Sequence, residues 1–327
     1  MKMSRRSSLS LPLVVIVAAF VAIGCGDFEE LETPETCSAQ QALCEAHVFL
    51  SVEEFEFLRQ NSDPIILDAR RELEDFEAQH VPGAHFAHWG EHRGELDSLF
   101  DDDEKLQDYI QSIGVEDDRA VIVYGEGDGS GGDAVAGNLY WTLEYVGHDE
   151  VYLVDGGLQA WIDARYDALD SGNSEPEATD FEIERRDELL ATVDDLKEVI
   201  DDEEDDTVII DTRRESEFVG EEIRNNPYSG KVRTSVHYHW EDVFDDDNTL
   251  RDADELKAEF EEVGFAPGVD TVPYCQSGVR SGYFYAVLQS LGYPDPVNYD
   301  GSWRELAVAY DEGDISEDYV KIIDEAE

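Results

Sequence analysis

The chain has 327 residues, enough for two domains that each bury an apolar core. It carries 80 acidic residues against 23 lysines and arginines, which gives a formal net charge of -57. This charge excludes nucleic-acid binding and electrostatic binding to an anionic lipid surface, because both require a basic face.

The first 24 residues have the pattern of a secretory signal. Three cationic residues among the first six precede an apolar run at residues 11–23, which is too short for a comfortable membrane span. Residues 22–25 (Ala-Ile-Gly-Cys) resemble the lipobox of bacterial lipoproteins. That resemblance implies cleavage before Cys25 and lipidation of this cysteine, and Gly26 after it favours the outer membrane. A plain signal peptide or an uncleaved anchor is the alternative.

Export would place the following segment, residues 25–47, in an oxidising compartment as a tether. Cys37 and Cys44 lie close together in this segment, and we predict a disulfide between them. Apart from His47, no histidine or further cysteine stands at a spacing typical of a metal site. We therefore predict neither a metal nor a cofactor.

An internal repeat organises the chain after residue 48. Residues 68–71 (Asp-Ala-Arg-Arg) recur 143 residues later at 211–214 (Asp-Thr-Arg-Arg). Residues 155–157 (Asp-Gly-Gly) recur 145 residues later at 300–302 (Asp-Gly-Ser). Two copies of one domain are therefore expected.

Each copy opens with a helix-capping pattern, at residues 51–54 and 192–195. Strand-like apolar runs separated by helical patterns then follow at residues 65–67, 120–124, 208–210 and 271–274. This alternation predicts α/β domains, each with a mainly parallel sheet. The predicted segments are a signal peptide (1–24), a tether (25–47), a first domain (48–169), a linker (170–188), a second domain (189–312) and an acidic C-terminal tail (313–327).

Residues 275–280 (Cys-Gln-Ser-Gly-Val-Arg) lie between the last apolar run and a helical pattern at residues 283–291. On a strand-to-helix turn, loop N–H groups and the helix N-terminus favour a thiolate, and Arg280 adds a full positive charge. We therefore predict that Cys275 is a nucleophile. The alternative is a buried, unreactive cysteine, which is common among free thiols.

This six-residue loop resembles the active-site loop of rhodanese-type sulfurtransferases. Related phosphatases and arsenate reductases have a loop one residue longer, whose arginine would fall at Ser281 here. Residues 80–84 (His-Val-Pro-Gly-Ala) and 299–303 (Tyr-Asp-Gly-Ser-Trp) are similar to further motifs of tandem members. The resemblance implies two tandem rhodanese-like domains, each a mainly parallel sheet flanked by helices on both faces, with the working cysteine only in the second.

The resemblance further implies that Cys275 takes a sulfane sulfur and passes it, as a persulfide, to cyanide or a thiol. The donor would be thiosulfate, which we favour, or 3-mercaptopyruvate. A phosphatase or arsenate-reductase-like activity and a non-catalytic sulfur-binding module stay open as alternatives. The expected active-site loop continues after the cysteine with Gln276, Ser277, Gly278, Val279, Arg280 and Ser281.

Both donors are anions, so a chain of this charge needs local cations to hold them. Arg224 and Lys231 are candidates for donor binding, because in the family their segment faces the active loop. A surface ion pair without function is the alternative for each. Asp211 and Arg213 are expected to support the loop, and an acid such as Asp211 is considered as an ion-pair partner for Arg280.

Three further features of the sequence say little about the activity of the chain. The first copy has a glycine-rich loop without a thiol at residues 125–132, and it lacks the Lys-Ser/Thr ending of a phosphate-binding P-loop. For His237 and His239, half-buried packing is favoured over a role in the pocket. The acidic excess is interpreted as adaptation to a saline habitat, with solubility as the alternative.

Overall fold

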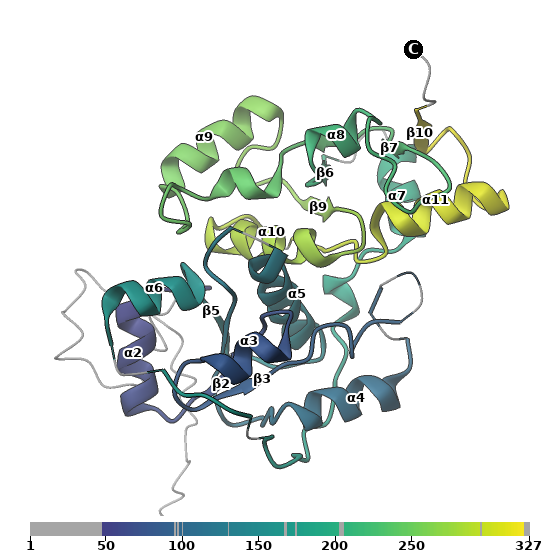
Figure 1. The fold of residues 1–327 in the computed structure, drawn as a ribbon. Coiled ribbons are helices and arrows are strands. Elements are labelled where there is room, and N and C mark those ends of the chain that lie inside the picture. The colour runs from purple at the N-terminus through teal and green to yellow at the C-terminus, as the bar shows by residue number, and fades with distance from the viewer. Residues whose placement is uncertain are drawn as a thin grey trace, which may run out of the picture.

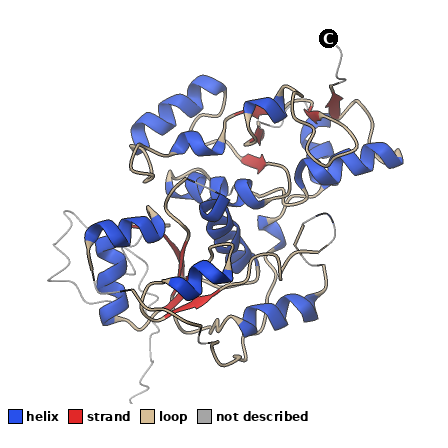
Figure 2. Cartoon of the chain, in the orientation of Figure 1, coloured by secondary structure: helices blue, strands red, loops and turns tan. Residues whose placement is uncertain are grey.

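The computed structural model of the chain describes residues 48–323, except residues 95, 97, 100, 130, 167–168, 174, 203–205 and 295. The predicted signal peptide, the predicted lipidation site at Cys25 and the predicted disulfide between Cys37 and Cys44 lie outside the described residues. Figure 1 shows two α/β units that meet through one central helix from each copy, and Figure 2 shows short strands surrounded by helices in both units. No helix in the described part is both long enough and apolar enough to cross a membrane.

The first copy is built on a parallel five-stranded sheet in the order β1-β5-β4-β2-β3. Its strands are β1 (Phe49–Leu50), β2 (Ile65–Asp68), β3 (Ala84–Phe86), β4 (Val121–Tyr124) and β5 (Val151–Val154). Its helices are α2 (Val52–Asn61), α3 (Leu73–Ala78), α4 (Asp103–Ser112), α5 (Gly131–Tyr145) and α6 (Gly157–Ala164). Alternate residues of β2 enter the apolar clusters on opposite faces of the sheet, which confirms that both faces are covered.

The second copy has a parallel sheet in the order β8-β6-β9 and a separate antiparallel pair, β10-β7. Its strands are β6 (Val208–Asp211), β7 (Gly230–Val232), β8 (Val236–His237), β9 (Thr271–Tyr274) and β10 (Val320–Ile322). Its helices are α7 (Val193–Asp201), α8 (Glu215–Phe218), α9 (Ala253–Val263), α10 (Val279–Ser290) and α11 (Ser302–Glu312), with short 3-10 turns at Asp187–Leu189 and Trp240–Val243. The predicted parallel sheet is present, and the antiparallel pair beside it was not foreseen.

The predicted capping boxes and strands are confirmed, because these features depend on residues that are close together in the sequence. The N–H of Glu54 donates to Ser51 Oγ while the Glu54 carboxylate accepts from the Ser51 N–H, and Thr192 and Asp195 make the same reciprocal pair. The four predicted strands are found as β2, β4, β6 and β9, within one residue at each end. The predicted helix at residues 283–291 instead begins four residues earlier, as α10, directly after Gly278.

The predicted linker and the predicted C-terminal tail both contribute residues to the fold. Phe181, from the predicted linker, is buried in the core, and the N–H of Glu184 donates to Val146 O. In the predicted C-terminal tail, Val320 is buried and β10 pairs with β7. These apolar side chains explain why both segments pack despite their acidic neighbours.

The two copies meet where α5 crosses α10, and one apolar cluster runs through both. A Cβ at Gly137 on α5 would lie 2.3 Å from Cα of Tyr283, and one at Gly282 on α10 would lie 2.8 Å from Cα of Asn138. A glycine from each helix therefore lets the two backbones touch. This close contact brings loops of the first copy against the cysteine loop of the second.

Candidate active site

The cysteine loop joins the end of β9 to the start of α10. Cys275 follows Tyr274 directly, and its side chain is only 1% exposed. Gly278 has φ 76, and a Cβ at this position would lie 2.0 Å from Oδ1 of Asp300, so a side chain does not fit. The tight turn directs the N–H groups of Ser277 and Ser281 at the cysteine sulfur.

Ser302 holds this loop from below. Its hydroxyl oxygen accepts hydrogen bonds from the N–H groups of Cys275 and Gly278, both at 3.0 Å, and donates to Tyr299 O at 2.8 Å. It lies 4.0 Å from Sγ of Cys275. Ser302 has φ 55, a left-handed backbone conformation that is costly for a residue with a Cβ. The strained backbone of Ser302 therefore lies next to the reactive sulfur.

The loop favours the ionised form of the thiol. Burial acts to raise the pKa of Cys275, but the charge of Arg280 and the hydrogen bonds from the Ser281 and Ser277 N–H groups outweigh it, and the pKa is lowered from its ordinary value. A lower pKa increases the fraction of thiolate, which is the nucleophilic form of cysteine.

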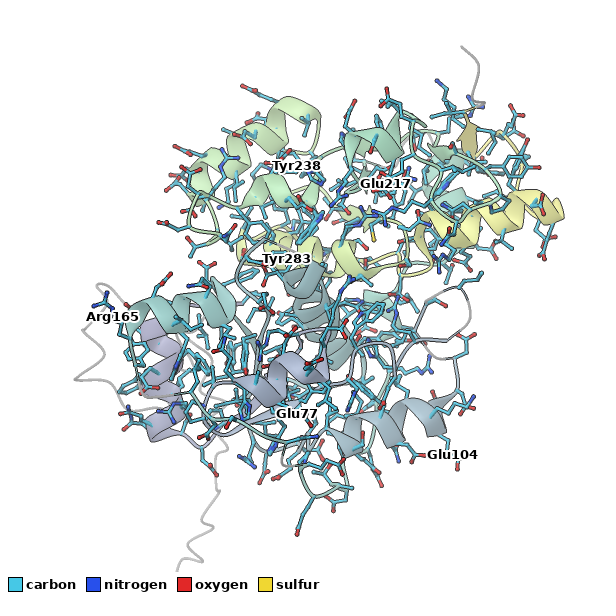
Figure 3. The ribbon with its side chains drawn as sticks, viewed as in Figure 1. Glu77, Glu104, Arg165, Glu217, Tyr238 and Tyr283 are labelled. Carbon is cyan, nitrogen blue, oxygen red and sulfur yellow. The ribbon has the colours of Figure 1, made fainter. Side chains whose placement is uncertain are left out.

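Arg280 pairs with Glu217, a residue that the sequence did not single out. The guanidinium binds the Glu217 carboxylate through two hydrogen bonds of 2.6 and 3.0 Å, and Glu217 is 1% exposed. Although burial opposes ionisation, Arg280 and then Arg224 lower the pKa of Glu217 to about 2. Arg224 Nε lies 3.3 Å from Glu217 and 3.2 Å from Glu222. Figure 3 labels Glu217 in the second copy.

Asp211 is therefore not the partner of Arg280. Both of its oxygens are taken by Arg213, at distances of 2.6 to 3.2 Å, and by the hydroxyl of Tyr274 at 2.6 Å. Arg213 also donates to Gly230 O at 2.7 Å. All of these side chains are buried, and they link β6, β7 and β9 beneath the loop. Asp211 and Arg213, the two residues expected to support the loop, therefore lie beneath it and bind each other.

Cys275 opens onto a cavity of about 460 Å³ between the two copies. Its lining contains five arginines, two tryptophans and residues of the cysteine loop. From the first copy it receives Arg71, Trp89, Gly131 and Ala134; from the second, Arg214, Arg224, Asn225, Trp240, Glu241, Cys275, Gln276, Ser277, Val279, Arg280 and Arg304. In a chain of net charge -57, this concentration of arginines makes the cavity a site for anions.

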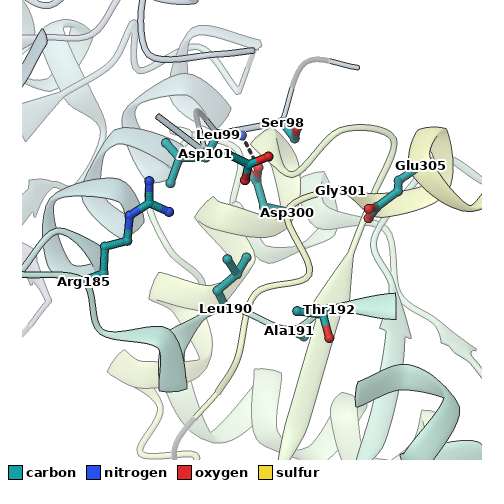
Figure 4. Close-up of a pocket in the computed structure, with 10 residues that line it drawn as sticks. All are labelled: Ser98, Leu99, Asp101, Arg185, Leu190, Ala191, Thr192, Asp300, Gly301 and Glu305. Carbon is teal, nitrogen blue, oxygen red and sulfur yellow. Dashed lines mark hydrogen bonds between the residues drawn. The ribbon is translucent and has the colours of Figure 1, made fainter. Parts of the chain in front are cut away.

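Two contacts fix the loop from outside. The side-chain amides of Gln276 and Asn226 bond reciprocally, at 2.7 and 3.1 Å. From the first copy, Arg93 donates to Ser277 O at 2.6 Å and to Asp300 Oδ1 at 2.8 Å. Asp300 also accepts from the Leu99 N–H at 2.6 Å, beside a second cavity of about 180 Å³ (Figure 4). The first copy thus helps to position the cysteine loop of the second.

The other predicted cation lies away from the cavity lining. Lys231 is on β7, where its Nζ lies 3.3 Å from the ring centre of Phe218. His237 stacks on the same ring and contacts the Arg213 carbonyl at 2.7 Å through Nε2, and His239 is half-buried beside Glu241. Both histidines pack as the sequence favoured. Of the two candidate donor-binding residues, the structure brings only Arg224 to Cys275.

The carboxylate of Asp133, on helix α5, occupies the glycine-rich loop of the first copy. Asp133 accepts hydrogen bonds from the N–H groups of Gly127, Asp128 and Gly129, at 2.7 to 3.2 Å. A phosphate would have to displace this buried carboxylate, so the loop is not an anion site. Among the described residues, no group of three or more His, Cys, Asp or Glu side chains could hold a metal ion.

The residues missed from the sequence lie far from the loop along the chain. Arg71, Trp89 and Arg93 belong to the first copy, and Glu217 and Asn226 precede the cysteine by about 50 residues or more. One signal was available: Arg71 and Arg214 occupy the same place in the repeated Asp-x-Arg-Arg motif. The repeat alone does not show that both would face one cavity.

A family model described as the rhodanese-like domain matches residues 51–164 and 192–309, once in each copy. A putative thiosulfate sulfurtransferase of Haloferax volcanii is 28% identical over 258 residues, covering 75% of this chain and 87% of the relative. A probable 3-mercaptopyruvate sulfurtransferase of Pseudomonas aeruginosa is 29% identical over 265 residues, covering 74% of this chain and 89% of the relative.

A solved structure supports the fold. The anaerobic ergothioneine biosynthesis enzyme from Chlorobium limicola, in complex with trimethyl histidine, superposes with a TM-score of 0.70 at 21% sequence identity. The match covers 79% of this chain and 67% of that one. At this sequence identity, the similarity supports the fold alone.

Proposed function

The chain belongs to the rhodanese family, and we propose that it is a sulfurtransferase that moves a sulfane sulfur from thiosulfate or 3-mercaptopyruvate to a thiophilic acceptor through a persulfide on Cys275. The two relatives described above carry these two activities in their names. The observation that carries the proposal is the position of Cys275, a buried thiol with a lowered pKa on the wall of an arginine-lined cavity.

In the first half-reaction, the Cys275 thiolate attacks the outer sulfur of thiosulfate. A new S–S bond forms, the S–S bond of thiosulfate breaks, and sulfite leaves with the bonding electron pair. In the second half-reaction, cyanide attacks the outer sulfur, thiocyanate leaves, and the Cys275 thiolate is restored. The covalent persulfide intermediate divides one difficult transfer into two easier steps.

The residues around the loop have defined roles in this scheme. The N–H groups that face the sulfur stabilise the thiolate at the start and at the end of the cycle, when its charge is greatest. Arg280 supplies a fixed positive charge, and Glu217 holds it in place. Arg224, on the cavity wall, is the proposed contact for the anionic end of the donor. The positive charges of Arg280 and Arg224 favour thiosulfate, the more highly charged of the two donors.

The proposal is tested by thiocyanate formation. The chain from residue 27 onward, incubated with thiosulfate and cyanide, should form thiocyanate, and Cys275→Ser should abolish this activity. Arg165→Gln, at an exposed site beyond α6 and away from the cavity lining, serves as the control. Hydrolysis of an aryl phosphate in place of thiocyanate formation would support the phosphatase alternative and overturn the proposal.

The location of the protein is a separate proposal, supported by the sequence of the first 25 residues. Cys25 would be lipidated after cleavage of residues 1–24, and the two domains would face the periplasm from a lipid anchor. Labelled palmitate should enter the full chain but not Cys25→Ala in a bacterial host. An unlabelled wild type would contradict the anchor without affecting the enzyme assignment.

A further inference from the structure

The repeated Asp-x-Arg-Arg motif places two arginines in each copy, and their roles differ. The first arginine of each motif forms an ion pair with the aspartate of the same motif. Arg70 binds Asp68 at 2.8 to 3.0 Å. Arg213 binds Asp211 at 2.6 to 3.2 Å. All four side chains are buried. These pairs are structural and leave no charge for a ligand.

The second arginines, Arg71 and Arg214, both line the cavity above Cys275, one from each copy. Arg71 lies over the ring of Trp89, with its guanidinium carbon 5.0 Å from the ring centre. It forms no ion pair with any described residue. Arg214 has only a loose contact of 3.6 Å with Glu241, and its side chain is 53% exposed. These two guanidinium groups are therefore available to a bound anion.

Exposure places this pair at the outer end of the cavity. Cys275 is 1% exposed and the side chain of Arg280 13%, whereas Arg71 is exposed and Arg214 is more than half exposed. Arg280 and Arg224 already share the carboxylates of Glu217 and Glu222, although the side chain of Arg224 is itself 37% exposed. Arg71 and Arg214 are thus less tightly paired with carboxylates than Arg280 and Arg224, and they lie at the exposed end of the cavity.

The cavity is also larger than the proposed donor requires. Its volume of about 460 Å³ is in the usual range for pockets that enclose drug-sized ligands. Thiosulfate has five heavy atoms and would fill only the inner part. The remaining space and the outer arginines fit a second substrate that carries its own negative charge.

We propose that Arg71 and Arg214 bind the carboxylates of the sulfur acceptor, so that the preferred acceptor is an anionic thiol. This inference rests on the proposed sulfurtransferase function. A guanidinium group binds a carboxylate through two parallel N–H···O bonds, and a molecule of this net charge repels a carboxylate elsewhere on its surface. The two arginines therefore select acceptors that bear carboxylates over neutral thiols.

The transfer step is balanced without any further reactant. The acceptor thiolate attacks the outer sulfur of the protonated Cys275 persulfide and forms a new S–S bond. The S–S bond to Cys275 breaks, and its electron pair stays on the cysteine as the thiolate. The product is the acceptor persulfide, which retains the proton.

The test compares two acceptors of similar size, mercaptosuccinate with two carboxylates and thioglycerol with two hydroxyls. Thiosulfate is the donor, and kcat/KM is measured for wild type, Arg71→Gln, Arg214→Gln and the double variant. Arg165→Gln is the matched control, because it removes the same charge from an exposed site beyond α6, away from the cavity lining. Cyanide turnover in each variant reports whether the inner site is intact.

Wild type should prefer mercaptosuccinate, and each single variant should lower this preference about five-fold, as expected for an exposed ion pair of about 1 kcal/mol. The double variant should lower it about 25-fold if the two contacts are independent. Cyanide turnover and the KM for thiosulfate should stay within about two-fold of wild type in all variants, and Arg165→Gln should match wild type throughout.

Three results would overturn the inference. One is an unchanged acceptor preference in the double variant with cyanide turnover intact, which leaves the sulfurtransferase function standing. Another is a raised KM for thiosulfate with either acceptor, which would assign the pair to the donor. The last is a wild type that forms no persulfide from any donor, which would remove the proposed function together with this inference.

Discussion

At the residue scale, the cysteine loop depends on a hydroxyl in a strained position. Ser302 and Gly157 occupy equivalent places in the two copies and have nearly the same backbone angle, φ 55 and φ 51. The first copy has no thiol to support and uses glycine, which adopts this angle at little cost. The second copy keeps a serine there, and its hydroxyl accepts two loop N–H groups. The strain is therefore linked to the working loop.

Ser302→Gly should separate strain from function. The variant loses the acceptor for the N–H groups of Cys275 and Gly278 but also loses about 1 kcal/mol of backbone strain. We expect thiocyanate formation to fall about ten-fold, as for the loss of about 1.4 kcal/mol of transition-state stabilisation. The melting temperature should fall less than in Ser302→Ala, because the relief of strain offsets part of the cost of two N–H groups left without an acceptor. Ser302→Ala, which keeps the strain and lacks the hydroxyl, should lose both activity and stability. Full activity in Ser302→Gly would contradict the role of the hydroxyl.

Glu217 should show its contribution in the pH dependence of stability. Its pKa in the folded protein is lowered to about 2 from an ordinary value of 4.5, so its stabilising effect is present above about pH 4.5 and is lost as the pH falls towards 2. Glu217→Gln leaves Arg280 with a neutral partner and should cost about 3 kcal/mol at pH 7.

Urea unfolding of wild type and Glu217→Gln at pH 7 and pH 3, at equal ionic strength, measures this effect. The difference in the free energy of unfolding should shrink as the pH falls. A difference that is the same at both pH values would mean that the carboxylate charge is not what stabilises this site.

The residue scale also shows where sequence reasoning succeeds. The thiol, the loop and the capping boxes were predicted because their chemistry lies within a few residues. The partner of Arg280 was not, since Glu217 is 63 residues away and no local pattern links the two. Asp211 was considered for that role and is excluded because Arg213, two residues later, already occupies both of its oxygens.

At the element scale, the crossing of α5 and α10 determines where the cavity forms. Strand alternation predicted both sheets, but the contact between helices of different copies depends on packing that no single segment specifies. This packing brings Arg71 and Trp89 to the wall opposite Cys275. Lys231 was a candidate for donor binding, but its position on β7 places its side chain against Phe218 instead of the cavity. This packing, too, could not be predicted from the local sequence.

Gly137→Ala tests the close approach of these helices. The new methyl carbon would lie 2.3 Å from the backbone of Tyr283, so α5 and α10 must separate. We expect the free energy of unfolding to fall by about 1–3 kcal/mol, as for other overpacked cores. Thiocyanate formation should also fall, because the cavity wall from the first copy moves away from Cys275. Unchanged stability in thermal or urea unfolding would contradict the packing described here.

At the scale of the whole molecule, the net charge of -57 opposes the compact state. Many surface cations are already paired with acids, so the remaining acidic residues repel one another and any anionic substrate. Raising the salt concentration from about 0.05 to 2 M shortens the screening length from over 10 Å to a few ångströms. The melting temperature should therefore rise with potassium chloride. A melting temperature that is flat or falls over this range would contradict the saline interpretation and favour a role in solubility alone.

The most direct test of the account is the fate of the Cys275 sulfur after exposure to a donor. The protein is incubated with thiosulfate in the absence of an acceptor, and is then alkylated and digested. The mass of the peptide that contains Cys275 is measured by mass spectrometry. We predict a gain of one sulfur atom on this peptide, which disappears when cyanide is added. A Cys275 peptide of unchanged mass after thiosulfate and after 3-mercaptopyruvate would contradict sulfur transfer through this residue.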